Sequence, residues 1–356
     1  MALPTKYRSF RRTTGDLPHA ITPSQETLPE RLGPNDVLIK IHAVSLNYRD
    51  VAMLNGRYPV KVIDRGVPAS DCAAEVVGIG SAVRGFEKGD HVAPIFDINN
   101  LSGQDDASMR ALGGDVDGVL REYAVFNEEV LVQLPKYLSW EEVCRTSQCY
   151  ASTIICAGVT AWNALDLPNV MTHGRSALLQ GTGGVSMFAL LLCRAAGLTP
   201  IITSSSDEKL ESIKKLSPEA RGINYKQHPD QVSEVARMTD GKGVDVVVNN
   251  TGVGSLITDI GSLRQRGGVV SLVGFLDGFK ADWDPSALMA MMGKAARLKG
   301  IAVGSKLDYQ ALSKFLEEKE LRLDPLIDRT FSFDESSQAF DYLWSGKHVG
   351  KVIIKL

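Results

Sequence analysis

Hydrophobic and polar positions follow two different periods along the chain. In its first third, short runs rich in Val, Ile and Ala alternate with Gly, Pro and Asn, and the clearest of them span residues 36–47, 73–80 and 89–96. Short β-rich runs between turn residues predict strands, here mostly antiparallel. From about Ser139 onward, apolar runs alternate instead with longer amphipathic segments. The change of period predicts two domains of different architecture.

The second part of the chain pairs each apolar run with a helical pattern. Runs rich in Val, Ile and Leu suit strands that are buried on both faces, and the amphipathic segments between them suit crossover helices. This order predicts an α/β fold with a doubly wound parallel sheet. The alternation begins with 176–181 and 184–197 and continues with 199–206, 207–216, 244–250, 255–267 and 268–274.

The end of the chain returns to a strand, a helix and a strand over residues 329–356. We therefore expect a substrate domain at 1–138 that is completed by 306–356, and a nucleotide domain at 139–305. The polar stretch 97–118 interrupts the strand pattern and predicts a long surface loop near a functional edge.

Composition and charge exclude several classes of partner. The 356 residues are 44% hydrophobic, enough to bury two ordinary domains. The formal net charge is −3, and Lys and Arg form no runs that would meet a phosphate backbone. Nucleic acid is therefore not an expected partner. No stretch approaches the apolar length that spans a bilayer, so we expect no membrane partner.

The expected location is the cytosol, with an organellar alternative left open by the basic residues near the start. The five cysteines, at positions 72, 144, 149, 156 and 193, have neither the paired spacing of a zinc knuckle nor a dense framework. Their pattern predicts reduced thiols and no disulfide.

A glycine-rich turn follows the first strand of the second domain. Gly181, Gly183 and the small Ser186 occupy the three small positions of the dinucleotide fingerprint, between a predicted strand and a predicted helix. The first position makes the tight turn, the second lets the backbone approach a pyrophosphate, and the third allows close packing of the helix. The alternative is a purely structural turn, but the further strand–helix units behind it favour a cofactor site.

The end of the second strand bears on which cofactor is bound. An enzyme selective for NAD usually has an acidic residue there, whereas this chain has Ser204, Ser205 and Ser206, followed by Lys209. Serine hydroxyls and a lysine favour a 2′-phosphate, and therefore NADP. Asp207 argues for NAD, although we expect it at the N-cap of the next helix, where Asp is common for capping alone.

Several motifs occur in a characteristic order along the chain. They are CAGVTAWNAL, QGTGGVS, TSSSDEKL, INYK, GKGVDVVVNNTG, GGVVSLVGF, KGIAVGSK and GKHVGKVIIKL. Together they resemble the medium-chain dehydrogenase/reductase superfamily, and in particular its zinc-independent branch of quinone oxidoreductases and enoyl reductases. The resemblance covers nearly the whole chain, and it implies a GroES-like β domain, a Rossmann nucleotide domain and an active site in the cleft between them.

The resemblance also implies which residues line an NADPH site. Asn47 would reach the nicotinamide ribose or the substrate oxygen. The other expected cofactor-binding residues are Thr160, Gly181, Thr182, Gly183, Gly184, Val185, Ser204, Ser205, Lys209, Tyr225, Asn250, Thr251, Val273, Gly274, Phe275 and Val303.

The resemblance allows the question of a metal to be asked of particular residues. Where zinc-dependent relatives have two Cys and one His, we match Asn47, Asp71 and Cys156. This set suits zinc poorly, because zinc prefers imidazole and thiolate. We expect no catalytic zinc, and Cys156 is better explained as a small core residue. The four clustered cysteines of a structural zinc lobe are also missing from 97–118.

Without a metal, other groups must stabilise the charge that hydride addition creates on a conjugated carbonyl. In enoyl reductases an asparagine, an aspartate and a following tyrosine occur at this place, which implies Asn47 and Tyr58 as catalytic candidates. Tyr58 would assist protonation or hold the substrate oxygen, with an aromatic lid over the turn as the alternative role and Tyr48 as the runner-up. Asp50 is expected to orient neighbouring loops.

Three hypotheses of function follow. The first is an NADPH-dependent oxidoreductase that reduces activated double bonds of conjugated carbonyls (enone, enal, quinone or enoyl thioester) without metal. The second is interconversion of alcohols and ketones, and the third is a non-catalytic NADPH-binding sensor protein. By analogy with the family, we expect a homodimer that pairs through an edge strand near 297–306. The sequence does not name the small-molecule substrate.

Overall fold

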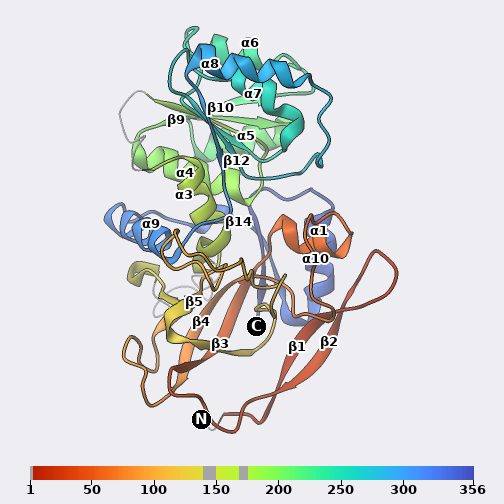
Figure 1. The fold of residues 1–356 in the computed structure, drawn as a ribbon, viewed down its shortest axis with the longest axis vertical. Helices are drawn as coiled ribbons and strands as arrows, with labels where there is room; N and C mark the ends of the chain where they lie inside the picture. Colours follow the sequence, from red (N-terminus) through yellow and green to blue (C-terminus); the bar gives the residue numbers. More distant parts are fainter. Residues whose placement is uncertain (1–2, 139–149, 168–174) are drawn as a thin grey trace. The chain divides into compact units, whose positions relative to one another are not determined.

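The computed structural model describes residues 3–138, 150–167 and 175–356 (Figure 1). The chain folds into two compact units, residues 1–159 with 304–356 (unit 1) and residues 160–303 (unit 2). The C-terminal segment thus returns to the N-terminal unit. Within the described ranges, no helix combines the length and the apolar character that crossing a bilayer would need.

Unit 1 is built on a mostly antiparallel sheet. β15 pairs with β3 antiparallel and with β14 parallel, so the end of the chain joins the N-terminal sheet. A separate antiparallel ribbon is formed by β1 (Lys6–Arg12) and β2 (Ile21–Thr27). The strands of the sheet are β14 (Ile327–Ser332), β15 (Lys351–Lys355), β3 (Asp36–Ser45), β4 (Asp71–Ile79), β5 (His91–Pro94) and β7 (Leu131–Gln133), in that order, and β6 (Tyr123–Asn127) pairs with β3.

Helices of unit 1 pack on this sheet through the apolar faces that the sequence pattern supplies. Val51 and Leu54 of one helix and Phe340 of another belong to the same buried cluster as the β3 and β4 side chains. The helices are α1 (Tyr48–Leu54), α9 (Lys306–Glu318) and α10 (Ser336–Trp344), with a π-helical turn η3 (Ile154–Gly158) and short 3₁₀ turns at η1 (Glu128–Val130), η2 (Lys136–Leu138), η6 (Asp324–Leu326) and η7 (Phe333–Glu335).

Unit 2 is a parallel sheet with the strand order of a doubly wound Rossmann fold, β10-β9-β8-β11-β12-β13. The order reverses between β8 and β11. The strands are β8 (Ser176–Leu179), β9 (Thr199–Ser204), β10 (Arg221–Asn224), β11 (Val246–Asn249), β12 (Val269–Leu272) and β13 (Arg297–Gly300). The helices are α3 (Val159–Ala164), α4 (Gly184–Ala196), α5 (Asp207–Leu216), α6 (Gln231–Met238), α7 (Leu256–Ser262) and α8 (Ala290–Lys294), with η4 (Val253–Ser255) and η5 (Pro285–Met289).

The fold class predicted from the sequence is confirmed. The predicted β-rich runs of the first domain correspond to β3, β4 and β5. The prediction for 97–118 was only partly right, because residues 102–110 are exposed but Ala111 and Leu112 lie in the core, 2% and 1% exposed. Two buried partners explain this: the Arg49 guanidinium donates to the Leu112 carbonyl at 2.8 Å, and the amide of Leu112 bonds to Phe96.

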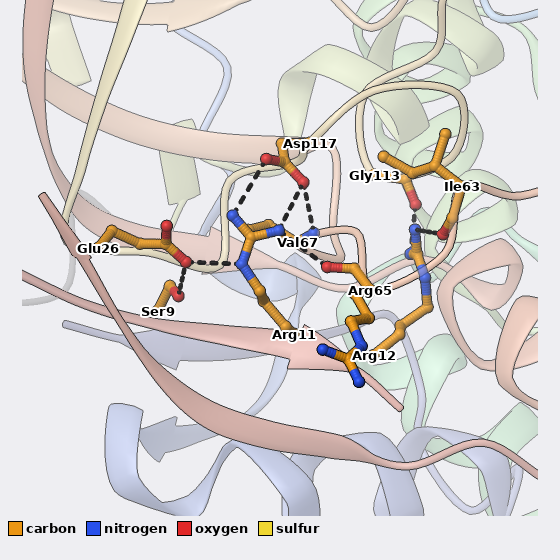
Figure 2. A network of polar contacts seen from close by, with 9 residues as sticks. All are labelled: Ser9, Arg11, Arg12, Glu26, Ile63, Arg65, Val67, Gly113 and Asp117. Atoms are coloured by element: carbon orange, nitrogen blue, oxygen red, sulfur yellow. Dashed lines mark hydrogen bonds and ion pairs between the residues drawn. The ribbon is translucent and has the colours of Figure 1, made fainter. Parts of the chain in front are cut away.

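An arginine network holds the β1–β2 ribbon against two loops of unit 1 (Figure 2). Arg11 donates to Glu26 at 2.6 Å and to both carboxylate oxygens of Asp117, and Asp117 also accepts from the amide of Val67. The neighbouring Arg12 donates to the Gly113 carbonyl at 2.6 Å. These bonds hold the loops at residues 63–67 and 113–117 against the ribbon.

Candidate active site

The glycine turn after β8 leaves open space above its backbone. Gly181 has a φ of 76°, which disfavours any side chain, and Gly183 is the N-cap of α4. A Cβ added at either glycine would meet no heavy atom within 4 Å. No side chain caps α4, so its first N–H groups are left to bind an anion. The turn therefore fits the pyrophosphate of a dinucleotide.

Side chains behind the turn hold it in shape. The Ser186 hydroxyl donates to the Gln180 carbonyl at 2.7 Å and accepts from the Asn250 amide at 2.9 Å. The Thr251 hydroxyl donates to the Gln180 side-chain oxygen at 2.6 Å. Asn250 and Thr251, predicted from the resemblance to bind cofactor, thus brace the glycine turn through their side chains.

A buried carboxylate lies beneath this brace. Asp259 accepts from the side chains of Gln180, Asn249 and Ser255 at 2.7, 2.6 and 3.0 Å. Burial raises the pKa of Asp259 to about 6, although these donors oppose the shift. The sequence analysis missed this network. Its signal was present as Gln180 and Asn249, two polar residues at the ends of otherwise apolar strands.

The serine-rich end of β9 differs in one respect from the prediction. Ser206, and not Asp207, is the N-cap of α5, because its hydroxyl accepts from the amide of Lys209. Asp207 is the first helical residue, and its carboxylate accepts from the amides of Asn224 and Gln227 at 2.7 and 2.5 Å. The prediction that Asp207 is the N-cap was therefore wrong. The N-cap is Ser206, and the helix begins one residue earlier than expected.

The remaining predicted cofactor residues of unit 2 gather at the carboxyl ends of its strands. Ser204 ends β9 and Ser205 follows it, Tyr225 follows β10 and is 48% exposed, and Lys209 lies in the first turn of α5. Thr182, Gly184 and Val185 belong to the glycine turn and the start of α4. Carboxyl ends at a switch point of strand order are where open α/β sheets bind ligands.

The turn after β12 packs directly on the end of β11. A Cβ on Gly274 would lie 2.4 Å from the Asn250 carbonyl, so this close approach requires glycine. Val273 donates its amide to Asn249, and Phe275 stacks on Phe279 with 5.2 Å between ring centroids. These contacts bring the Val273–Phe275 turn beside Asn250.

Two predicted residues lie at the chain ends of unit 2. Thr160 is buried in α3. Val303 has a φ of 61°, a conformation that a β-branched residue rarely adopts, and its carbonyl accepts from Asn163 at 2.9 Å.

The candidate residues of unit 1 surround the start of α1. Asn47 is the N-cap of α1, and the Asp50 carboxylate accepts from the backbone N–H of Asn47 at 2.8 Å. Asp50 is 1% exposed. That Asp50 orients neighbouring loops stays a prediction.

A lysine that the sequence analysis missed lies beside Asn47. Lys351, the first residue of β15, is 2% exposed, and its ammonium donates to the Leu46 carbonyl at 2.7 Å and to the Asn47 side-chain oxygen at 2.5 Å. Burial lowers the pKa of Lys351, while the charge of Asp71 opposes that shift. The only sequence signal was a lysine opening an apolar terminal strand, which usually indicates an exposed edge.

Asp71 and Cys156 complete this buried polar cluster. Asp71 accepts from the Ser70 hydroxyl at 2.7 Å and from the backbone amide of Cys156 at 3.1 Å. Burial raises the pKa of Asp71, and the Lys351 charge opposes the shift. Burial, reinforced by Asp71, raises the pKa of Cys156 to about 12, which keeps the thiol protonated.

This donor set does not fit a zinc ion. The Asn47 oxygen is engaged by the Lys351 ammonium. The set also offers an amide and a carboxylate where zinc favours thiolate and neutral imidazole, and Cys156 is its one soft donor. Across residues 3–138, 150–167 and 175–356, no three His, Cys, Asp or Glu side chains lie close enough to hold a metal ion.

Tyr58 lies against Arg49, a buried residue of α1. The Arg49 guanidinium lies 5.3 Å from the ring centroid of Tyr58, and its Nε is 3.4 Å from the phenol oxygen. Arg49 also lies 4.7 Å from the ring of Phe96. Tyr58 lines a cavity of about 210 Å³ together with Arg12, Leu17, Met53, Val60 and Ile63. The runner-up, Tyr48, stacks on Trp344 with 6.4 Å between centroids.

Comparisons with known proteins agree with this architecture. Residues 33–136 match the model of the alcohol dehydrogenase GroES-like domain, and residues 184–318 match that of the zinc-binding dehydrogenases. A zinc-type alcohol dehydrogenase-like protein of Schizosaccharomyces pombe is 38% identical over 341 residues, 94% of this chain and 95% of the relative. The chain belongs to the medium-chain dehydrogenase/reductase superfamily.

Other members of the superfamily match over nearly their whole length. The L-threonine 3-dehydrogenase of Pyrococcus horikoshii is 30% identical over 343 residues, 91% of this chain and 92% of the relative. A crystal structure from Sinorhizobium meliloti 1021, assigned provisionally as an alcohol dehydrogenase, superposes with a TM-score of 0.85 at 31% identity and 100% coverage of both chains.

Membership in the superfamily makes the chain an oxidoreductase of a family that uses pyridine nucleotides. The residues that would hold such a cofactor are those of the open glycine turn and the strand ends around it. The cofactor supplies or accepts a hydride, and the protein must then manage the charge and the proton that accompany it. In unit 1 the groups suited to this are Asn47, Lys351, Tyr58 and Arg49.

Proposed function

We propose that this oxidoreductase belongs to the zinc-independent branch and reduces the carbon–carbon double bond of conjugated carbonyl compounds with NADPH. The observation that carries the proposal is the occupied donor set at Asn47, Asp71 and Cys156. Where a zinc-dependent relative has two cysteines and a histidine, this chain has an amide oxygen bonded to the Lys351 ammonium, a carboxylate that accepts from Ser70 and Cys156, and a single thiol. Polarisation of the substrate oxygen then falls to hydrogen-bond donors.

The preference for NADPH is supported by the end of β9. Ser204 ends the strand and Ser205 follows it, so no carboxylate stands at the strand end, and Lys209 lies in the first turn of α5. The nearest acid, Asp207, is held by two amides of Asn224 and Gln227. Hydroxyl and ammonium donors suit a 2′-phosphate, which an acid at the strand end would repel.

The chemistry divides between two groups of unit 1. Hydride addition at the β-carbon moves the electron pair of the double bond onto the carbonyl oxygen, and the Asn47 amide is the donor that would stabilise the resulting enolate. A proton must then reach the α-carbon. Tyr58 is the candidate source, because a phenol that accepts a bond from Arg49 can still donate its own hydrogen.

A homodimer is part of the proposal. β13 is the edge strand of the unit 2 sheet and pairs only with β12 among the described strands. Leu298 on this strand is 43% exposed, and Met289 and Met292 nearby are 61% and 74% exposed. An open edge beside apolar side chains favours pairing with a second copy. Light scattering should give the mass of two chains, and the mass of one chain would refute this point.

The deciding experiment follows oxidation of the reduced cofactor by absorbance, with NADPH and separately NADH, against quinones, enals, enones and enoyl thioesters, with and without a chelator. Turnover that prefers NADPH and resists the chelator is the expected result. No oxidation with any conjugated carbonyl would refute the proposal. Cofactor binding with no turnover on the whole panel would support the sensor hypothesis.

The names of the relatives favour a second candidate, interconversion of alcohols and ketones. Both the fission-yeast protein and the Pyrococcus enzyme are named as dehydrogenases. In this case Tyr58 would exchange a proton with the alcohol oxygen. Zinc in purified protein at one ion per chain, with chelator-sensitive oxidation of alcohols, would establish this candidate in place of the first.

A further inference from the structure

The buried ammonium of Lys351 controls the orientation of one side-chain amide. It donates to the Asn47 oxygen at 2.5 Å and to the Leu46 carbonyl at 2.7 Å, and none of the described carboxylates lies within ion-pair distance of it. An amide has an acceptor end and a donor end. Because a cation holds the oxygen, the nitrogen must point away from Lys351.

The donor end of Asn47 is buried and has no well-formed hydrogen bond. Its nitrogen faces Asp71 closely enough to act as a side-chain donor that lowers the pKa of that carboxyl, yet it meets full hydrogen-bond geometry with no acceptor of the described chain. The two Asp71 oxygens already accept from Ser70 and Cys156. A buried donor without an acceptor is costly, and such costs are retained where a ligand supplies the missing partner.

The charges around the amide all favour the same orientation. A cation at the oxygen and an anion on the nitrogen side both disfavour the flipped amide, in which N–H would face the ammonium. The cation also draws electron density toward the oxygen and makes the N–H groups better donors. The backbone of Asn47 is fixed as well, because its N–H donates a hydrogen bond to the Asp50 carboxylate.

We propose that Lys351 is a positioning residue that fixes Asn47 so that its amide donates to the carbonyl oxygen of the substrate. The inference rests on the proposed function, since it assigns to a lysine–asparagine pair the oxygen polarisation that a metal would otherwise supply. Lys351 itself does not touch the substrate, because both of its bonds go to the protein and it is 2% exposed.

The test compares four variants of the full chain: Lys351→Met, Asn47→Ala, the double variant, and Lys355→Met as a matched control on the same strand. We expect kcat/KM for the conjugated carbonyl to fall about 30-fold to 100-fold in the first two. In Lys351→Met the Kd for NADPH should stay within about threefold of wild type, because the glycine turn lies in unit 2. The control should stay within about twofold.

Coupling between the two residues distinguishes positioning from general damage. If Lys351 acts through Asn47, the double variant should be no worse than Asn47→Ala within about threefold. Fully additive losses, or a Lys351→Met enzyme within about threefold of wild type, would overturn the inference.

A spectroscopic readout makes the test independent of turnover. In protein with ¹⁵N-labelled asparagine, the Asn47 side-chain signal is assigned by its loss in Asn47→Ala. We expect this signal to move in Lys351→Met and to stay in Lys355→Met. An unmoved signal refutes the Lys351–Asn47 pair even if no conjugated carbonyl is reduced, whereas a moved signal without any turnover refutes only the proposed function.

Folding is checked for each variant by circular dichroism. If Lys351→Met does not fold, Lys351→Arg decides, because its planar head cannot reproduce both bonds of an ammonium. We expect a shifted Asn47 signal together with a loss of kcat/KM of at least about fivefold. A shifted signal with full activity, or lost activity with an unshifted signal, would contradict the inference.

Discussion

The glycine turn of unit 2 and the polar cluster of unit 1 are built on opposite principles. At the turn, side chains are absent where a ligand would lie, and a Cβ on Gly181 or Gly183 would meet only open space. In the cluster, the chain's own side chains fill the site, and Lys351 occupies the Asn47 oxygen. The turn offers space for a ligand beside its backbone. The cluster instead uses its own side chains to fix the orientation of the Asn47 amide.

The difference separates what each region can contribute to a reaction. Backbone N–H groups at an uncapped helix can hold any pyrophosphate, so the turn supplies affinity but little choice of substrate. The buried cluster leaves one donor nitrogen unbonded, and therefore imposes a direction on an incoming oxygen. We expect binding and chemistry to respond separately to substitutions in the two regions.

The largest effect should come from filling the open turn. Gly183 has ordinary backbone angles and no atom within 4 Å of an added Cβ, so Gly183→Val should fold normally. Its side chain would occupy the space above the turn, and we expect NADPH binding to weaken at least about 100-fold. The quenching of intrinsic fluorescence by NADPH measures this. Gly293→Val, also in open surroundings of unit 2, is the control, and equal binding by both variants would refute the cofactor site.

A smaller effect, confined to catalysis, is expected at Tyr58. Tyr58→Phe removes the phenol hydroxyl that lies 3.4 Å from Arg49, and we expect kcat to fall about 10-fold to 100-fold with NADPH affinity unchanged. Steady-state kinetics on the best substrate of the panel measures it. Tyr48→Phe serves as the comparison, because Tyr48 stacks on Trp344 and should tolerate loss of its hydroxyl. If Tyr48→Phe is the slower enzyme, the proton donor has been assigned to the wrong tyrosine.

These two regions also differ in how far the sequence predicted them. The glycine turn is local: Gly181, Gly183 and Ser186 lie within six residues, and their spacing alone indicates a strand–turn–helix junction. The Asn47 cluster is assembled from residues 47, 71, 156 and 351, which only the folded chain brings together. No periodicity marks Lys351 as buried, because its partner Asn47 is more than 300 residues away in the sequence.

The error at Asp207 has a similar origin. Serine and aspartate cap helices almost equally well, so composition could not decide between Ser206 and Asp207. What decided it is a tertiary contact, because Asn224 and Gln227 hold the Asp207 carboxylate. Likewise, residues 111–112 look like loop by composition and are buried because Arg49 binds the Leu112 carbonyl.

The choice of cofactor should respond to one charge near the turn. Ser205→Asp places a carboxylate at the end of β9, where it would repel a 2′-phosphate and accept from ribose hydroxyls. We expect the ratio of kcat/KM for NADPH over NADH to fall about tenfold. Ser212→Asp adds the same charge to the exposed face of α5 and should leave the ratio unchanged. An unchanged ratio in Ser205→Asp would mean that the end of β9 does not contact the 2′-phosphate of NADPH.

The smallest effect concerns the brace beneath the turn. Burial raises the pKa of Asp259 from 3.8 to about 6, so between these values the folded chain binds a proton that the unfolded chain does not. Stability from this group therefore rises as the pH falls through about 6, and it is absent at neutral pH, where both states are ionised. Between pH 7 and pH 5 the gain is about 1 kcal/mol.

Asp259→Asn isolates this contribution, because every other titrating group is common to both proteins. The free energy of unfolding of each protein is measured in urea at pH 7, 6 and 5. The value for the wild type minus the value for the variant should increase by about 1 kcal/mol as the pH falls from 7 to 5. Loss of the carboxylate also removes an acceptor from Gln180 and Asn249, so a constant offset at all three pH values is expected as well. An offset with no dependence on pH would mean that Asp259 titrates as an ordinary carboxyl.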